Sequence, residues 1–156
     1  MNLEQIWDQT NNQIIFHKLS SKAIIPSKGT TNSAGWDLAS PHSYIVPTQS
    51  RILIGTQISV KLPPGTYGQI APRSSLALAG IDIGGGIIDP DYEGEIKVIL
   101  INNSLQEFHV APNDRIAQLI CVKFEPGQIC TEYNHASFNT SFFGTRGHQG
   151  FGSTGK

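Results

Sequence analysis

The sequence predicts an all-β domain with one short helix, and three observations support this fold class. Short runs of β-branched and aromatic residues recur along the chain, and several of them alternate with polar residues. Turn-forming clusters such as Pro63-Pro64-Gly65 separate these runs. Only residues 74–79 have the composition of a helical turn. Many short strands with turn residues between them are typical of a β-sandwich or β-barrel.

The first half of the chain starts with a mostly polar leader, residues 1–12, in which Leu3, Ile6 and Trp7 are isolated apolar residues. We interpret this leader as flexible chain ahead of the domain. Strands are then expected where Ile, Val, Leu, Phe or Tyr cluster, at residues 14–16, 44–46, 51–54, 57–62 and 67–70.

The second half continues the pattern, with strands expected at residues 87–88, 95–101, 107–110 and 115–124. The runs 95–101 and 115–124 are apolar on both faces, which predicts that they lie in the middle of the protein or against another subunit. Residues 134–156 are rich in Gly, Ser, Thr, Asn and His, so we expect a mobile C-terminal arm there. The predicted organisation is a leader at 1–12, a β domain at 13–133 and an arm at 134–156.

Length and composition narrow the class of protein. A chain of 156 residues is long enough for one domain with a real core. Its net charge of −1 gives no support for binding to nucleic acid or to an anionic membrane. Cys121 and Cys130 show no CxxC spacing, which favours reduced thiols in the cytoplasm or nucleus, with a disulfide between them as the alternative. No signal peptide and no run of ~20 apolar residues is present.

Residues 84–95, called the acidic segment below, combine three consecutive glycines, four carboxylates and a tyrosine. Glycine lets a ligand approach the main chain closely, so this mixture predicts a hairpin that contacts a ligand. Asp89 directly follows the apolar pair Ile87-Ile88 and is expected at a strand end, where side chains are displayed. The alternative is an ordinary glycine-rich hairpin with a solvated acidic turn.

Two clusters suggest phosphate binding but have structural explanations as well. Arg73, Ser74 and Ser75 offer a guanidinium, two hydroxyls and their amides at a helix start, which suits a phosphate. Serines also cap helices without any ligand. In residues 146–155 the glycine amides can wrap oxyanions and Phe151 can lie over a flat base. A disordered terminus is the alternative there.

Two further clusters place polar groups in or beside apolar strands. Asp37 follows Gly35 near a strand start, where a turn aspartate that bonds its own backbone is the alternative to a functional role. Arg115 and Gln118 stand three residues apart in an otherwise apolar strand. Because a buried charge must be paired, an ion pair between Arg115 and Asp37 or another carboxylate explains the arginine equally well.

Taken together and in order, segments 34–38, 72–77, 86–95, 115–119 and 146–155 resemble the five motifs of the trimeric dUTPase family, and the resemblance extends over residues 13–156. It implies a distorted jelly roll, a β-clip-like barrel, and a homotrimer whose active sites each take residues from three chains. It also implies hydrolysis of dUTP to dUMP and pyrophosphate. Mg²⁺ would be held by the triphosphate and water, with no direct protein ligand.

The resemblance assigns roles to single residues. Asp89 resembles the general base that activates a water for attack on the α-phosphorus. Tyr92 resembles the ring that packs on the deoxyribose and leaves no room for a 2′-hydroxyl. Asp37 would order the water around Mg²⁺ from a distance. The other substrate-binding residues implied are Arg73, Ser74, Ser75, Gly86, Ile87, Ile88, Lys97, Gln118, Arg146, Phe151, Gly152, Ser153 and Thr154.

Three positions depart from the family pattern that we expect, namely Trp36, Pro90 and Glu93, and all are expected near the rim of the site. Two other functions stay open at this stage. A dCTP deaminase would share the β architecture, and a non-enzymatic module would keep the fold for binding a nucleotide or a protein partner. Viral and cellular members of the family fit the sequence equally well.

Overall fold

The computed structural model describes residues 12–127 and 129–132, and within them it contains eleven strands and one short helix. The predicted all-β class is therefore confirmed. The strands are β1 (Ile15–Lys18), β2 (Trp36–Ala39), β3 (Tyr44–Val46), β4 (Ser50–Gly55), β5 (Ile58–Lys61), β6 (Thr66–Ala71), β7 (Ile81–Gly84), β8 (Ile87–Ile88), β9 (Lys97–Asn102), β10 (Phe108–Val110) and β11 (Arg115–Lys123), and the helix is α2 (Ser74–Leu78). All of them belong to a compact unit that ends at Glu125.

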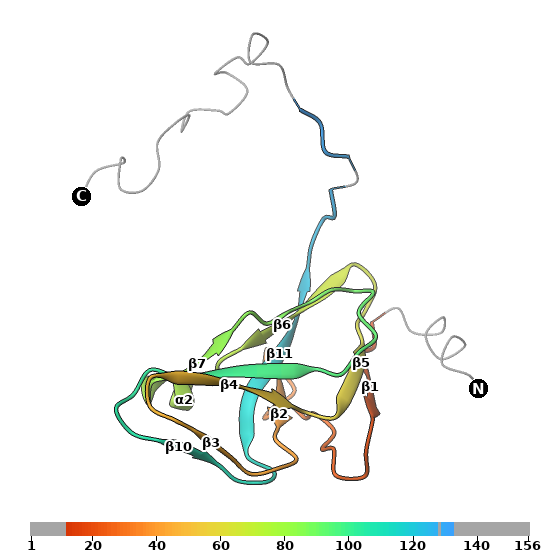
Figure 1. Ribbon diagram of the computed structural model, residues 1–156. Coiled ribbons are helices and arrows are strands. Elements are labelled where there is room, and N and C mark those ends of the chain that lie inside the picture. The colour runs from red at the N-terminus through yellow and green to blue at the C-terminus, as the bar shows by residue number, and fades with distance from the viewer. Residues whose placement is uncertain (1–11, 128, 133–156) are drawn as a thin grey trace. The chain divides into compact units, whose positions relative to one another are not determined.

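The strands form four antiparallel sheets, as the arrangement in Figure 1 illustrates. The largest has the order β2-β11-β6-β8, the next has the order β4-β9-β7, and β1-β5 and β10-β3 are two-stranded. Within the described part of the chain these hydrogen-bonded ladders do not close into a barrel. The two doubly apolar runs were predicted to lie in the middle of the protein or against another subunit. β9 and β11 are inner strands of their sheets, in line with the first alternative, and a contact with another subunit stays a prediction.

The hydrophobic core is built from alternate residues of these strands. In β9, Val98 and Leu100 are fully buried, whereas Ile99 and Ile101 on the other face are half-buried. Further fully or almost fully buried side chains from other strands join this core, among them Leu38, Val46, Ile54, Ile58, Ile81, Ile116 and Leu119. Each buried aliphatic side chain of this size contributes about 1.5–3 kcal/mol, so this alternation fixes which residues face outward.

The predicted glycine-rich hairpin is wrong, because the strands on its two sides belong to different sheets. β7 pairs with β9, whereas β8 pairs with β6. Gly85 and Gly86 have φ angles of 61° and 96°, which turn the chain from one sheet to the other. A Cβ on Gly86 would lie 2.7 Å from the carbonyl oxygen of Ile70, so only glycine allows this approach.

Other expectations were close or incomplete. Most predicted strands are present with ends shifted by one or two residues. β2 was expected only as a strand start near Asp37, and β7 was not predicted. Cys121 and Cys130 are both free thiols, which rules out the disulfide between them in this structure. No helix in the described residues is long and apolar enough to cross a membrane. The predicted leader, apart from residue 12, and the predicted arm lie outside the described residues.

Candidate active site

A cluster of one carboxylate and two guanidinium groups, Asp37, Arg73 and Arg115, lies where three strands meet, and we call it the arginine cluster. Asp37 Oδ1 is 3.5 Å from Arg73 Nε, and Asp37 Oδ2 is 3.4 Å from Arg115 Nη1. Arg73 Nη1 also donates to the backbone oxygen of Arg115 at 3.1 Å. The side chain of Asp37 is only 17% exposed, so the carboxylate is more buried than the two guanidinium groups that it pairs with.

The register of the largest sheet brings this cluster together. Gln118 of β11 lies opposite Asp37 of β2 on one side and opposite Ala71 of β6 on the other. Its side-chain nitrogen Nε2 donates to the oxygen of Pro72 at 3.0 Å, which fixes the segment leading to Arg73. Gly35 makes room for this side chain, since a Cβ there would lie 2.3 Å from Gln118 Oε1. Three of the four described motifs therefore converge through β11.

The structure decides among the structural explanations for these polar residues. The ion pair between Asp37 and Arg115 is confirmed, but the Arg115 side chain is 57% exposed and so is not a buried charge. The turn explanation for Asp37 is wrong, because Asp37 lies in β2 and its carboxylate faces the arginines. Serine capping is also wrong: Arg73 is the N-cap of α2 without a side-chain capping bond, and Ser74 and Ser75 are exposed.

The acidic segment presents a different environment. Asp89 follows β8 directly and is exposed, and its carboxylate makes no hydrogen bond or ion pair within the described residues. Its backbone oxygen accepts the N–H of Tyr92 at 3.0 Å. The Tyr92 hydroxyl donates to the backbone oxygen of Glu95 at 2.8 Å, and Tyr92 is 44% exposed. A carboxylate that is solvated and unpaired is free to accept a proton.

The backbone ahead of Asp89 is held against β6. The N–H of Ile70 donates to the Gly86 oxygen at 2.7 Å. Ile87 and Ile88 then pair with Gln69 and Gly68. Ile88 is buried and Ile87 is 61% exposed, so residues 87 and 89 face the same outer side of the strand.

Lys97 is also exposed, at the start of β9 and paired with Gly55 of β4. Like Ile87 and Asp89, it is a predicted substrate-binding residue whose side chain the structure leaves exposed.

Asp89 and Arg73 lie toward opposite ends of β6. Ile88 pairs with Gly68, and Arg73 stands five residues after Gly68 along a run that is extended at Arg73. Continuing that antiparallel register by one residue puts Asp89 opposite Tyr67, six residues before Arg73. At ~3.3 Å per residue, the two backbone positions are separated by roughly 20 Å along the strand direction. One chain therefore assembles the arginine cluster and presents Asp89, but it does not bring them side by side.

A cavity of about 220 Å³ lies beside the acidic segment. Its walls are the outer face of the β1-β5 ribbon and the turn that carries Tyr92, and the lining residues are Ile15, His17, Ser59, Val60, Lys61, Pro90, Asp91, Tyr92 and Glu93. Of the predicted site residues, only Tyr92 lines it. Ligand pockets are usually ≈ 300–1,000 Å³, so this cavity is too small to hold a nucleoside triphosphate.

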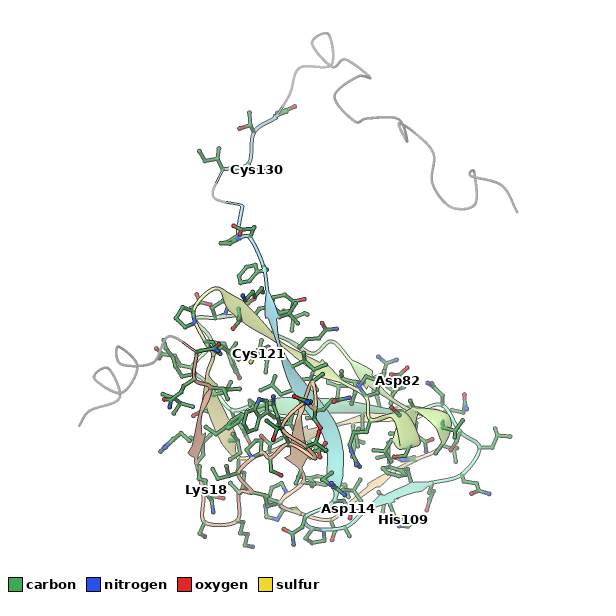
Figure 2. All side chains as sticks on the ribbon, turned by 180° about the vertical axis from the view of Figure 1, so that it is seen from behind. Lys18, Asp82, His109, Asp114, Cys121 and Cys130 are labelled. Carbon is green, nitrogen blue, oxygen red and sulfur yellow. The ribbon has the colours of Figure 1, made fainter. Side chains whose placement is uncertain are left out.

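Trp36 in β2 and Cys121 in β11 are both part of the packing around the largest sheet. Trp36 packs edge-on against Phe16 at 5.5 Å and lies beneath the Lys28 ammonium at 5.1 Å, so this departure from the family pattern belongs to the packing between β1 and β2. Burial raises the pKa of the Cys121 thiol, an effect that Lys28 partly opposes. Figure 2 shows Cys121 on β11 among the packed strands.

Sequence reasoning did not single out Glu95 and Gln57, which contact each other beside the acidic segment. Glu95 Oε1 accepts the backbone N–H of Gln57 at 2.8 Å and so ties the end of the acidic segment to the β4–β5 turn. The only sequence signal was a fourth carboxylate in the acidic segment. The predicted residues Arg146, Phe151, Gly152, Ser153 and Thr154 lie outside the described residues.

A family model described as dUTPase matches residues 21–155. Deoxyuridine 5′-triphosphate nucleotidohydrolase of Vaccinia virus (strain Copenhagen) is 46% identical over 145 residues, covering 93% of this chain and 95% of the relative. The probable deoxyuridine 5′-triphosphate nucleotidohydrolase of Schizosaccharomyces pombe is 46% identical over 140 residues, covering 88% and 95%.

Solved structures agree with the fold. A mutant dUTPase of Staphylococcus bacteriophage 80alpha with dUpNHpp has a TM-score of 0.81 at 22% identity, covering 93% of this chain and 99% of that chain. A dUTPase from phage phi11 of S. aureus has a TM-score of 0.73 at 21% identity, covering 81% and 100%. The jelly-roll likeness and the near full-length match to curated relatives lead to one conclusion: the chain belongs to the dUTPase family.

Proposed function

We propose that this protein hydrolyses dUTP to dUMP and pyrophosphate. The observation that carries the proposal is the 46% identity, over almost the full length of both chains, to a deoxyuridine 5′-triphosphate nucleotidohydrolase. The exposed, unpaired carboxylate of Asp89 adds a chemical reason, because water activation needs a base that is free to accept a proton. Such an activity removes dUTP that would enter DNA and supplies dUMP for thymidylate synthesis.

The chemical step is assigned to Asp89. Its carboxylate accepts a proton from a water that attacks the α-phosphorus in line, and the pyrophosphate leaves on the opposite side. Phosphoryl transfer depends mostly on positioning and charge stabilisation, so one well-placed base is enough. The ladder to β6 supports this role, since it fixes the backbone directly before Asp89.

Nucleoside selection is assigned to the backbone at Gly86, Ile87 and Ile88 and to Tyr92. Amide and carbonyl groups at a uracil edge discriminate against cytosine, whose donor and acceptor positions are reversed. The Tyr92 ring is partly exposed and anchored through its hydroxyl, which suits a rigid face against deoxyribose. Lys97 lines the nucleoside side of the same site.

The phosphates are assigned to Arg73, Ser74, Ser75 and Gln118. Arg73 is held in place by Asp37, and the two serine hydroxyls are exposed at the start of α2. Within the described residues, no three His, Cys, Asp or Glu side chains gather to hold a metal. Mg²⁺ usually keeps several waters and binds substrate phosphates, and bound in that way it would neutralise triphosphate charge. Asp37 would then act on its hydration from a distance.

A homotrimer with shared sites is proposed because one chain leaves Asp89 and Arg73 roughly 20 Å apart along β6. The outer face of the β4-β9-β7 sheet supports association, since Leu53 is 56% exposed and Ile99 and Ile101 are half-buried beside it. Exposed apolar faces of this kind mark contacts between proteins.

Mixing two impaired variants tests shared sites. Asp89→Asn and Arg73→Ala subunits, unfolded together and refolded, should regain roughly a quarter of parental activity, because random assembly restores that share of intact sites. Each variant refolded alone is the control. Mixed subunits as inactive as the separate variants would contradict sharing.

The C-terminal residues Arg146, Phe151, Gly152, Ser153 and Thr154 are proposed to close over uracil and the γ-phosphate. Ending the chain after Thr145 should then lower turnover strongly and leave the oligomer intact, because closure excludes water and completes the set of donors. Size-exclusion chromatography with light scattering checks assembly. An unchanged rate in the shortened protein would refute this role.

The proposed function is tested by pyrophosphate release from dUTP, UTP, dTTP and dCTP in the presence of Mg²⁺. We expect hydrolysis of dUTP in strong preference to the other three. Appearance of dUTP or dUMP from dCTP would point to a deaminase, and binding of dUTP without release of pyrophosphate would point to a non-enzymatic module. The two free cysteines favour the cytoplasm or nucleus as the place of action.

A further inference from the structure

We propose that Glu95 is a positioning residue that fixes the Tyr92 ring from behind and so sets the preference for deoxyribose over ribose. The inference rests on the proposed function, in which Tyr92 faces the sugar. Its evidence is a chain of contacts that runs from Tyr92 through Glu95 to the β4–β5 turn, forty residues earlier in the sequence. We call the contacts among Gly55, Gln57 and Glu95 the brace.

The first link joins Tyr92 to the backbone of Glu95. The Tyr92 hydroxyl donates to the Glu95 carbonyl oxygen at 2.8 Å. The ring lies directly over Gly94, where an added Cβ would be 2.5 Å from the Tyr92 hydroxyl oxygen and 2.7 Å from the ring carbon that carries it. The position of the ring therefore depends on where the main chain at residues 94–95 lies.

The second link fixes the peptide between Glu95 and Ile96. The Ile96 N–H donates to the Ile58 oxygen at 2.7 Å. In a trans peptide the carbonyl and the N–H point in opposite directions, so this bond turns the Glu95 carbonyl away from β5. The Ile96 oxygen also accepts the Thr56 N–H at 3.1 Å and the Thr56 hydroxyl at 2.7 Å.

The third link is the Glu95 carboxylate. Glu95 Oε1 accepts the Gln57 N–H at 2.8 Å, and it occupies the space over Gly55, where a Cβ would lie 2.5 Å away. Gln57 has a left-handed φ of 57°, which aims its N–H out of the strand direction. The Gln57 oxygen is held by the Leu19 N–H at 2.8 Å, so the donor of the brace is itself fixed.

These links make the brace specific to the side chains present. A carboxylate at 95 needs a residue without a side chain at 55 and an N–H directed toward it at 57. All three conditions are met by residues outside the predicted substrate-binding set. A sugar with an added 2′-hydroxyl is rejected only if the ring cannot move back, and the brace prevents that movement.

The experiment compares Glu95→Ala, Glu95→Gln, Gly55→Ala and the double variant Gly55→Ala with Glu95→Ala. The readout is the ratio of kcat/KM for dUTP to that for UTP. Glu95→Ala should lower this ratio about 5- to 10-fold, the scale of one partly solvated hydrogen bond to a charged group. Glu95→Gln keeps an acceptor oxygen and should retain most of the ratio.

The Gly55→Ala change attacks the same contact from the other side. Its methyl group should displace the Glu95 carboxylate and lower the ratio as Glu95→Ala does. In the double variant no carboxylate remains to be displaced, so the two effects should not add. Hydrogen exchange at the Gln57 amide should accelerate in Glu95→Ala and in Gly55→Ala, and it should stay slow in Glu95→Gln.

Glu107→Ala serves as the matched control, because Glu107 is exposed and contacts only His109, at 3.5 Å, among the interactions of the described residues. Its ratio should equal that of the parent. An active parent whose ratio is unchanged by Glu95→Ala, or additive losses in the double variant, would overturn the inference alone. A parent without dUTP hydrolysis would overturn the proposed function together with it.

Discussion

The arginine cluster and the acidic segment lie toward opposite ends of β6, and their charged groups are organised in opposite ways. In the cluster, the Asp37 carboxylate is 17% exposed and already holds two guanidinium groups. In the acidic segment, Asp89 is exposed and its carboxylate has no partner within the described residues. Groups that bind phosphate gain from being held in place before the ligand arrives, whereas a base must keep its lone pairs available.

The largest expected effect breaks the acidic side of this comparison. Asp89→Asn removes the proton acceptor and keeps the size of the side chain, so kcat for dUTP should fall about 10²- to 10⁴-fold while binding persists. Turnover and binding of a non-hydrolysable dUTP analogue are measured side by side. Asp91→Asn, an exposed acid on the same turn, is the control. A near-normal kcat in Asp89→Asn would remove Asp89 from the mechanism.

The support of the acidic segment by β6 is tested by two glycine substitutions. Gly86→Ala should lower the free energy of unfolding by roughly 2–4 kcal/mol, because left-handed strain adds to a clash with the Ile70 oxygen. Gly85→Ala has the same kind of strain but open space, with Ile99 Cδ1 at 3.9 Å, and should cost only about 1 kcal/mol. Urea unfolding at one protein concentration gives both values, and equal losses would contradict the close approach.

A smaller effect is expected in the arginine cluster. Arg73→Ala should lower kcat/KM for dUTP about 10- to 100-fold, since it removes a fixed guanidinium from the phosphate side. Arg115→Ala should have a smaller effect, because Arg115 is 57% exposed and Arg73 only 26%. Steady-state kinetics on both variants checks the order. A larger loss for Arg115→Ala would mean that the phosphate lies nearer β11 than we propose.

The smallest expected effect concerns the accessibility of Cys121 in β11, the strand that carries Arg115 of the arginine cluster. Burial raises the pKa of Cys121, so less of it is thiolate at a given pH, and its alkylation should rise only at higher pH than in the urea-unfolded chain. Cys130 is exposed and should react faster in the folded protein. Peptide mapping after iodoacetamide treatment separates the two. Equal rates would show that β11 opens readily.

The sequence was sufficient to predict most strands, because alternation and turn residues are local signals. It did not show that Gly84–Gly86 connects two sheets. Which partner a short strand pairs with depends on contacts far along the chain, here with β6 and β9. The pattern Ile81-Asp82-Ile83-Gly84 is too short to separate from a loop by its alternation alone.

The candidate site shows the same division between local and distant information. An Asp37–Arg115 ion pair was one of several explanations from sequence. The structure selects it by bringing the two side chains together, although Arg115 lies opposite Ala39 in the β2–β11 register. Glu95 was counted among the four carboxylates of the acidic segment but was given no role of its own, because its contacts are with Gly55 and Gln57 in another turn. Asp89 and Tyr92 were predicted from their motif, and the kinetics above test their roles.

The acidic segment begins at the junction between two sheets, and this placement affects its local unfolding. β7 pairs with β9 and β8 pairs with β6, so Gly85 and Gly86, which link them, are anchored in a separate ladder on each side. A surface loop unfolds locally at little cost in free energy, whereas a link between two ladders is released only when a ladder opens. Asp89 directly follows β8, so we expect the backbone before it to open slowly even though its side chain is exposed.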